Sequence, residues 1–171
     1  LVTVGVGVGY GLVVDGGVIT SPDAELGLLG TIPVPDGARP PVASPAMDCL
    51  TDTALERAWT AAGGGPMRAE AIVRRSADGD RAAVAVCASF ARRLGRLIGM
   101  LAAFTLPEVV VVAGERAAVA SLFEEQVMVG IAAVRRASAR SPTIAVREHE
   151  RVDWARGAAC LALRSRVMGE L

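Results

Sequence analysis

Small and apolar residues alternate strictly at the start of the chain, where glycine takes every second position from Gly5 to Gly11. A period of two is typical of a β-strand, so Gly5, Gly7, Gly9 and Gly11 are predicted to share one face of an extended segment. Asp15-Gly16-Gly17, between two apolar runs, predicts a tight hairpin turn. Residues 1–20 therefore form either a glycine-rich β-meander or a loop whose bare backbone N–H groups face a phosphate.

Residues 21–47 are rich in Pro, Gly and Asp, which predicts a loop region without a long helix. A helix capped by Asp48 or Thr51 is expected to run to about Ala62, where a glycine run ends it. A shorter helix is expected at 67–77, ending before Gly79-Asp80.

The longest predicted helix spans about residues 81–104, because apolar residues recur there at spacings of three and four. The members of this stripe are Ala83, Cys87, Phe90, Leu94, Leu97, Leu101 and Phe104. Four arginines lie off the stripe and are predicted to face solvent: Arg81, Arg92, Arg93 and Arg96.

An unbroken β-branched run, Val109–Val112, predicts a strand buried on both faces, as in a parallel sheet covered by helices. A helix at 116–137, a strand at 143–146 and a helix at 154–167 follow. This order indicates an α/β domain in which helices pack on a mixed sheet.

Composition narrows the possible classes of function. The length of 171 residues suits one domain, and 52% of the residues are hydrophobic. Eighteen acidic residues balance eighteen basic ones, so no excess of positive charge supports non-specific DNA binding by this chain. No apolar run reaches the roughly 20 residues of a membrane span. Three widely spaced cysteines suit a reducing cytoplasm, where we expect the protein.

Several of these motifs together resemble the ROK family (repressors, open reading frames and kinases). Gly5-Val6-Gly7-Val8-Gly9 followed by Asp15-Gly16 is similar to its second phosphate motif, and Gly79-Asp80 to its Gly-Asp. Residues 107–114 resemble its Pro-x-x-(apolar run)-Gly-Gly strand, whose glycines border the adenosine, and residues 157–159 resemble its Gly-Ala-Ala. The resemblance implies an actin-like ATPase, ribonuclease H-like lobe covering all of residues 1–171, with a vestigial nucleotide site at the four alternating glycines and Gly114.

Departures from the family pattern fall at its functional positions. Val6 stands where a phosphate-binding Thr is usual, and Leu28 where a Glu binds the sugar. Thr31 stands where a His binds sugar and zinc, which leaves it as a candidate effector contact. Val42 and Ser44 replace two knuckle cysteines, so that Cys49 alone remains and residues 21–47 form a degenerate zinc-knuckle region. Glu115 replaces the second glycine beside the adenosine.

These departures leave three functions open. The chain is the C-terminal effector and dimerisation lobe of an inactive ROK-type regulator, half of a divergent sugar kinase acting on a hexose with ATP, or a kinase-like interaction module. We expect no catalytic residue, metal or cofactor, with His149 in a solvated turn. Expected partners are a small sugar effector and a second copy in a homo-oligomer. DNA would be reached only through a helix-turn-helix absent from this sequence, as the N-terminal lobe is.

Overall fold

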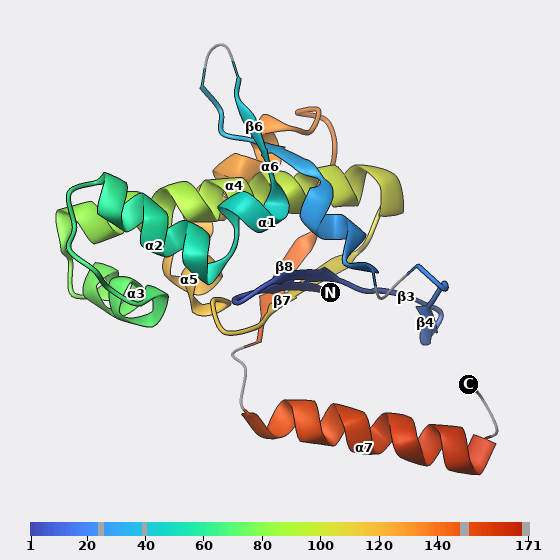
Figure 1. Ribbon diagram of the computed structural model, residues 1–171. Coiled ribbons are helices and arrows are strands. Elements are labelled where there is room, and N and C mark those ends of the chain that lie inside the picture. The colour runs from blue at the N-terminus through green and yellow to red at the C-terminus, as the bar shows by residue number, and fades with distance from the viewer. Residues whose placement is uncertain (24–25, 39–40, 148–150, 169–171) are drawn as a thin grey trace.

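A computed structural model describes the chain except for residues 24–25, 39–40, 148–150 and 169–171 (Figure 1). Its centre is a four-stranded sheet in the order β2-β1-β7-β8. The strands are Val8–Tyr10 (β2), Val2–Val4 (β1), Val109–Ala113 (β7) and Thr143–Val146 (β8). The β1–β2 pair is antiparallel, whereas β7 pairs in parallel with both β1 and β8, which confirms the mixed sheet.

The alternating glycines do not share one extended segment, and that prediction is wrong. The chain reverses after β1, so that Val4 lies opposite Val8 and Gly5 donates its N–H to the carbonyl of Gly7. The reversal needs glycine because the turn approaches other groups closely, as the site below shows. The first eleven residues are therefore a hairpin with its tip at residues 5–7.

The predicted turn at Asp15-Gly16-Gly17 is confirmed. Strands β3 (Leu12–Val14) and β4 (Gly17–Ile19) pair with Val14 opposite Gly17, and Asp15 and Gly16 between them have φ of 51° and 78°. Positive φ at both central residues is the geometry that an Asp-Gly pair favours in a two-residue hairpin.

The Pro-rich region is more regular than its composition suggests, so the prediction of a loop is wrong for part of it. A 3₁₀ helix, η2 (Leu28–Thr31), is followed by the paired strands β5 (Pro33–Pro35) and β6 (Ala43–Pro45). Pro33 stands opposite Pro45 at one end of this two-stranded hairpin, where a missing N–H donor interrupts no longer ladder. Val34, the next residue after Pro33, is fully buried and anchors the hairpin to the core.

Helices lie on both sides of the sheet, with α7 (Arg151–Met168) on the side away from α4 (Arg81–Thr105) (Figure 1). They are α1 (Ala46–Cys49), α2 (Asp52–Ala61), α3 (Ala69–Ala77), α4 (Arg81–Thr105), α5 (Ala118–Leu122), α6 (Glu124–Ala133) and α7 (Arg151–Met168). Thr51 caps α2 through its hydroxyl, and the Asp80 carboxylate caps α4 by accepting from Ala82 and Ala83. The single helix predicted at 116–137 is wrong, because Phe123 leaves helical geometry and separates α5 from α6.

Helix α4 is the main support of the core, as its periodicity predicts. Leu94, Leu97 and Ile98 have no exposed surface. Phe104, however, is 87% exposed, because the last turn of α4 projects beyond the core. Arg96 is buried rather than solvated, since the loop after β5 covers it so closely that a Cβ at Gly37 would collide with its guanidinium.

Close backbone contact joins α4 to α6. A Cβ at Gly95 would collide with the carbonyl oxygen of Val127, and one at Gly130 with the carbonyl oxygen of Arg92. Glycine is required at such a crossing because the two backbones leave no room for a side chain.

Strand β7 departs from its prediction in one respect. Val110 and Val112 are buried, but Val109 is 49% exposed and Val111 only half-buried. The prediction that both faces of this strand are buried is therefore wrong. Helix α7 lies on the side of the sheet away from α4 (Figure 1). His149 falls outside the described residues. Within the described part of the chain, no helix combines the length and apolarity needed to cross a bilayer.

Candidate functional site

The hairpin turn after β1 meets the start of α2. The carbonyl of Gly5 accepts a 2.8 Å hydrogen bond from the N–H of Asp52, and Gly5 forms a parallel bridge with Thr51. Since the Gly5 N–H is held by Gly7, this amide is not free to bind a phosphate. The turn is thus fixed at the carboxyl end of β1, the edge of a parallel sheet where ligands usually bind.

The segment after β7 reaches the same place. Gly114 has φ of 99°, and a Cβ there would collide with the carbonyl oxygen of Val4. The same oxygen accepts a 3.0 Å hydrogen bond from the N–H of Arg116. The structure therefore brings Gly5 and Gly114, two of the predicted nucleotide-site residues, to one edge of the sheet.

Glu115 lies over the hairpin turn. A Cβ at Gly5 would collide with the carboxylate of Glu115, so this carboxylate packs directly against the glycine backbone. The sequence motif places Glu115 beside the adenosine, whereas its side chain lies at the turn expected to face phosphate. A negative charge at this position disfavours a second anion there.

An ion pair fixes the surroundings of Glu115. Arg116 donates from Nε to Asp52 Oδ1 at 2.6 Å and from Nη2 to Oδ2 at 3.1 Å, a bidentate geometry. The side chains are only 13% and 17% exposed. The sequence analysis missed this pair, because 64 residues separate its members and no local pattern links them.

The remaining predicted residues gather elsewhere. Gly9 and Gly11 line a cavity of about 370 Å³ with Gly27 and Leu28. Thr31 does not line this cavity, and its Oγ1 donates to the carbonyl of Leu28 at 2.8 Å. The exposed Gly7 at the hairpin tip has no neighbour close to its missing Cβ. The predicted glycines thus divide between the glycine turn and this cavity, and Thr31 belongs to neither.

In the degenerate zinc-knuckle region, the remaining cysteine is a buried thiol. Cys49 is buried, and its Sγ lies 3.8 Å from the carbonyl oxygen of Ser44 and 3.9 Å from that of Ala46. Burial raises the pKa of this thiol, although Arg93 acts in the opposite direction. No group of three or more His, Cys, Asp or Glu side chains that could hold a metal ion is found among the described residues.

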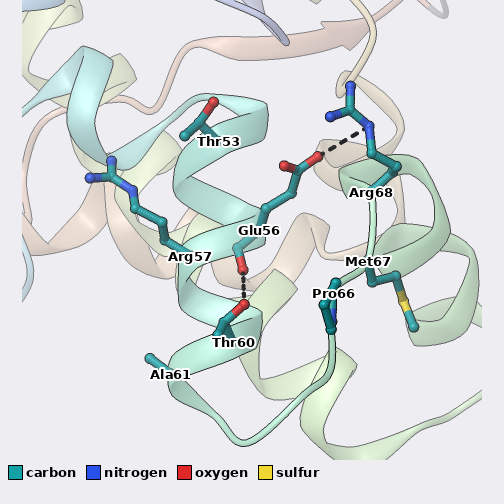
Figure 2. A pocket seen from close by; sticks show the side chains of 8 residues that line it. All are labelled: Thr53, Glu56, Arg57, Thr60, Ala61, Pro66, Met67 and Arg68. Atoms are coloured by element: carbon teal, nitrogen blue, oxygen red, sulfur yellow. Dashed lines mark hydrogen bonds and ion pairs between the residues drawn. The ribbon is translucent and has the colours of Figure 1, made fainter.

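A wider cavity of about 740 Å³ lies between α2 and the loop before α3 (Figure 2). Glu56 spans it, accepting from the N–H of Ala69 at 3.0 Å and lying 3.6 Å from Nε of Arg68. Thr60 donates to the carbonyl of Glu56 within the same helix. These contacts join α2 to α3 and contain none of the predicted site residues.

Comparison with known proteins identifies the family and relatives of the same fold. Residues 1–165 match the sequence profile of the ROK family. A search of curated protein sequences found no match. Among solved structures, the ROK hexokinase from Thermus thermophilus superposes with a TM-score of 0.69 at 24% identity, covering 85% of this chain and 51% of the hexokinase.

Two further structures represent the two branches of function. A glucokinase from Streptomyces griseus, in complex with glucose and AMPPNP, has a TM-score of 0.69 at 17% identity, covering 85% of this chain and 54% of that one. A ROK transcriptional regulator, a homolog of the Escherichia coli MLC protein, has a TM-score of 0.70 at 22% identity, covering 86% of this chain and 40% of its own. This chain spans about half the length of these proteins and has their actin-like fold. It belongs to the ROK family.

Proposed function

We propose that this chain is the C-terminal effector and dimerisation lobe of a ROK-type transcriptional regulator that lacks kinase activity. The observation that carries the proposal is the Glu115 carboxylate packed against Gly5. Phosphoryl transfer depends on positioning and on stabilising negative charge, and here a fixed negative charge lies against the phosphate turn.

Two further features support an inactive lobe. Val6 at the turn is 76% exposed and has no hydroxyl to offer a phosphate, and Gly5 uses its own N–H within the hairpin. By analogy with an oxyanion-hole donor, each such lost contact raises the barrier by about 2.7–4 kcal/mol. Several losses together would reduce turnover to background.

The cavity lined by Gly9, Gly11 and Leu28 is compatible with an effector site. Its lining also includes Ser21 and Asp23, whose side-chain oxygens can form hydrogen bonds with a neutral sugar. The apolar side chain of Leu28 cannot accept a hydrogen bond from a sugar hydroxyl. We therefore infer that any sugar is bound here through other groups and serves as a signal. Thr31, outside this lining, would contact it only after its hydroxyl leaves the Leu28 carbonyl.

A divergent sugar kinase is the alternative. It is favoured by the retained glycines of the hairpin and by the likeness to kinase structures. A coupled ATP-consumption assay on the full-length protein, over common hexoses and their N-acetyl forms, separates the two. The proposal expects no sugar-dependent turnover above background, and clear turnover with any of these sugars would replace it with the kinase.

The proposed dimer and effector response have separate tests. Sedimentation of the full-length protein is expected to show a homo-oligomer, and a purely monomeric species would contradict the dimerisation role. The same hexose series in thermal-shift measurements is expected to contain at least one sugar that stabilises the fold. Stabilisation by none of them would remove the effector role.

A further inference from the structure

A cavity of about 650 Å³ lies at the sheet edge opposite the glycine turn. It is bordered by the end of α4, by the starts of β7 and β8, and by the segment that follows α6. Strand β7 has five residues, so the two edges are about 16 Å apart. The volume falls within the range of small-molecule sites, roughly 300–1,000 Å³.

Arg135 lines this cavity, and its guanidinium carries unused donors. Its Nε and Nη1 are buried and have no hydrogen-bond partner among the residues that the structure describes. Only Nη2 is engaged, donating to the carbonyl of Arg140 at 3.0 Å. Buried polar atoms are nearly always paired, so unpaired donors on a permanently charged group indicate a missing acceptor.

The rest of the lining suits an anion. Arg140 adds a second positive charge, and Ser141 and Thr143 add hydroxyl groups. Glu108 is the acidic residue of the lining, and no ion pair joins it to either arginine in the described part of the chain. Leu106 and Pro107 form an apolar wall on the α4 side.

From the unpaired donors, the second arginine and the size of the cavity together, we propose that this cavity binds a small oxyanion ligand through Arg135, with Arg140 assisting. A phosphate or carboxylate group accepts from a guanidinium in the geometry that arginine favours. A small rotation of the Arg135 side chain toward the cavity turns its unpaired donors to the ligand. The site is independent of the glycine turn and of the proposed regulatory role.

The test is a titration followed by the Arg135 Nε–H signal in NMR spectra and by calorimetry. Inorganic phosphate and succinate serve as separate probes, one for each source of the oxyanion. We expect saturable binding of at least one probe with a shift of the Arg135 signal, and the probe that binds identifies the group. Saturation by neither probe overturns the proposal.

Variants distinguish anion binding at this cavity from a general effect of removing one positive charge. Arg135→Gln is expected to weaken binding at least tenfold, whereas Arg136→Gln, the same charge change on an exposed neighbour outside the cavity, is expected to stay within twofold. Arg140→Gln changes an exposed side chain and replaces Arg135→Gln as the test if that variant does not fold. We expect Arg140→Gln to weaken binding at least threefold. Equal losses in Arg136→Gln and in the cavity variants would overturn the proposal.

Discussion

Arg116 and Asp52 are joined by two hydrogen bonds, of 2.6 and 3.1 Å, that tie the segment after β7 to the first turn of α2. Both side chains are largely removed from solvent. The pair holds in place the backbone that carries Glu115, because Arg116 Nη1 also donates to the Glu115 carbonyl at 2.8 Å. The proposed regulatory lobe therefore keeps a rigid glycine site even though its chemistry has changed.

Removing one partner of this pair is expected to destabilise the fold. Arg116→Met leaves Asp52 largely buried and unpaired, and we expect a loss of about 2 kcal/mol in the free energy of unfolding, between the values for exposed and buried pairs. The control is Arg74→Met, which breaks the exposed pair of Arg74 with Glu70 and is expected to cost less than about 0.5 kcal/mol. Equal losses in urea melts would show that the Arg116 pair is no stronger than a surface contact.

Sequence alone predicts some local elements of this fold and misses its long-range contacts. The Asp15-Gly16 turn and the α4 stripe follow from spacing, because both depend on neighbours along the chain. The burial of Arg96 under the loop at Gly37 depends on how distant segments meet. Burial lowers the pKa of this guanidinium, and no helical spacing reveals that burial. Arg92 and Arg93, four and three residues earlier on the same helix, act in the same direction.

The candidate site shows the same division. The family motif locates Gly5, Gly114 and Glu115, but it places the Glu115 carboxylate beside the adenosine rather than over the hairpin turn. A turn that folds back at Gly5–Gly7 has the same glycine spacing as a straight strand. Spacing therefore predicts which residues matter here better than it predicts where their side chains lie.

Truncation within the α4 core is expected to be costly. Leu94→Ala and Leu97→Ala each remove a side chain with no exposed surface, so we expect losses of about 2–5 kcal/mol in the free energy of unfolding. Phe104→Ala is the control on the same helix, since that ring is 87% exposed, and its effect is expected to be within about 0.5 kcal/mol. A large effect of Phe104→Ala in denaturant melts would indicate that its ring is covered in solution.

The α4–α6 crossing is expected to exclude even a methyl group. Gly95→Ala places a Cβ against the Val127 carbonyl, so the clash is expected to outweigh the gain in helix propensity of about 1 kcal/mol and to lower the melting temperature. Gly157→Ala in α7 is the matched control, because an added Cβ would meet no described atom within 4 Å beyond its chain neighbours and the adjacent helix backbone, and it is expected to be neutral or stabilising. Thermal melts in which both variants stabilise the protein would contradict the close crossing.

Acid is expected to weaken the start of α4. The N–H of Ala83, and next Arg75, hold the pKa of Asp80 below its usual range, so the folded state favours the ionised carboxylate. This contribution to stability is present above the unfolded pKa of about 3.9 and is lost as the pH falls through the lower folded value. Wild type is therefore expected to be more stable than Asp80→Asn at pH 7, with the difference closing below about pH 4. A difference that stays constant from pH 7 to pH 2 in urea melts would exclude this linkage.

Replacing Glu115 is expected to strengthen nucleotide binding without producing catalysis. Glu115→Gly removes the carboxylate that packs against Gly5 and opens the turn to a phosphate, so we expect ADP to bind at least tenfold more tightly than to wild type. Glu125→Gln is the control, because it removes one negative charge from the first turn of α6 instead, and it is expected to leave the affinity within twofold. Calorimetry with ADP measures the affinity of both variants.

Turnover is still expected to be absent from Glu115→Gly, since Val6 offers no hydroxyl and the Gly5 amide remains bound to Gly7. An equal gain in Glu125→Gln, or no gain in Glu115→Gly, would show that the carboxylate over Gly5 is not what excludes the nucleotide.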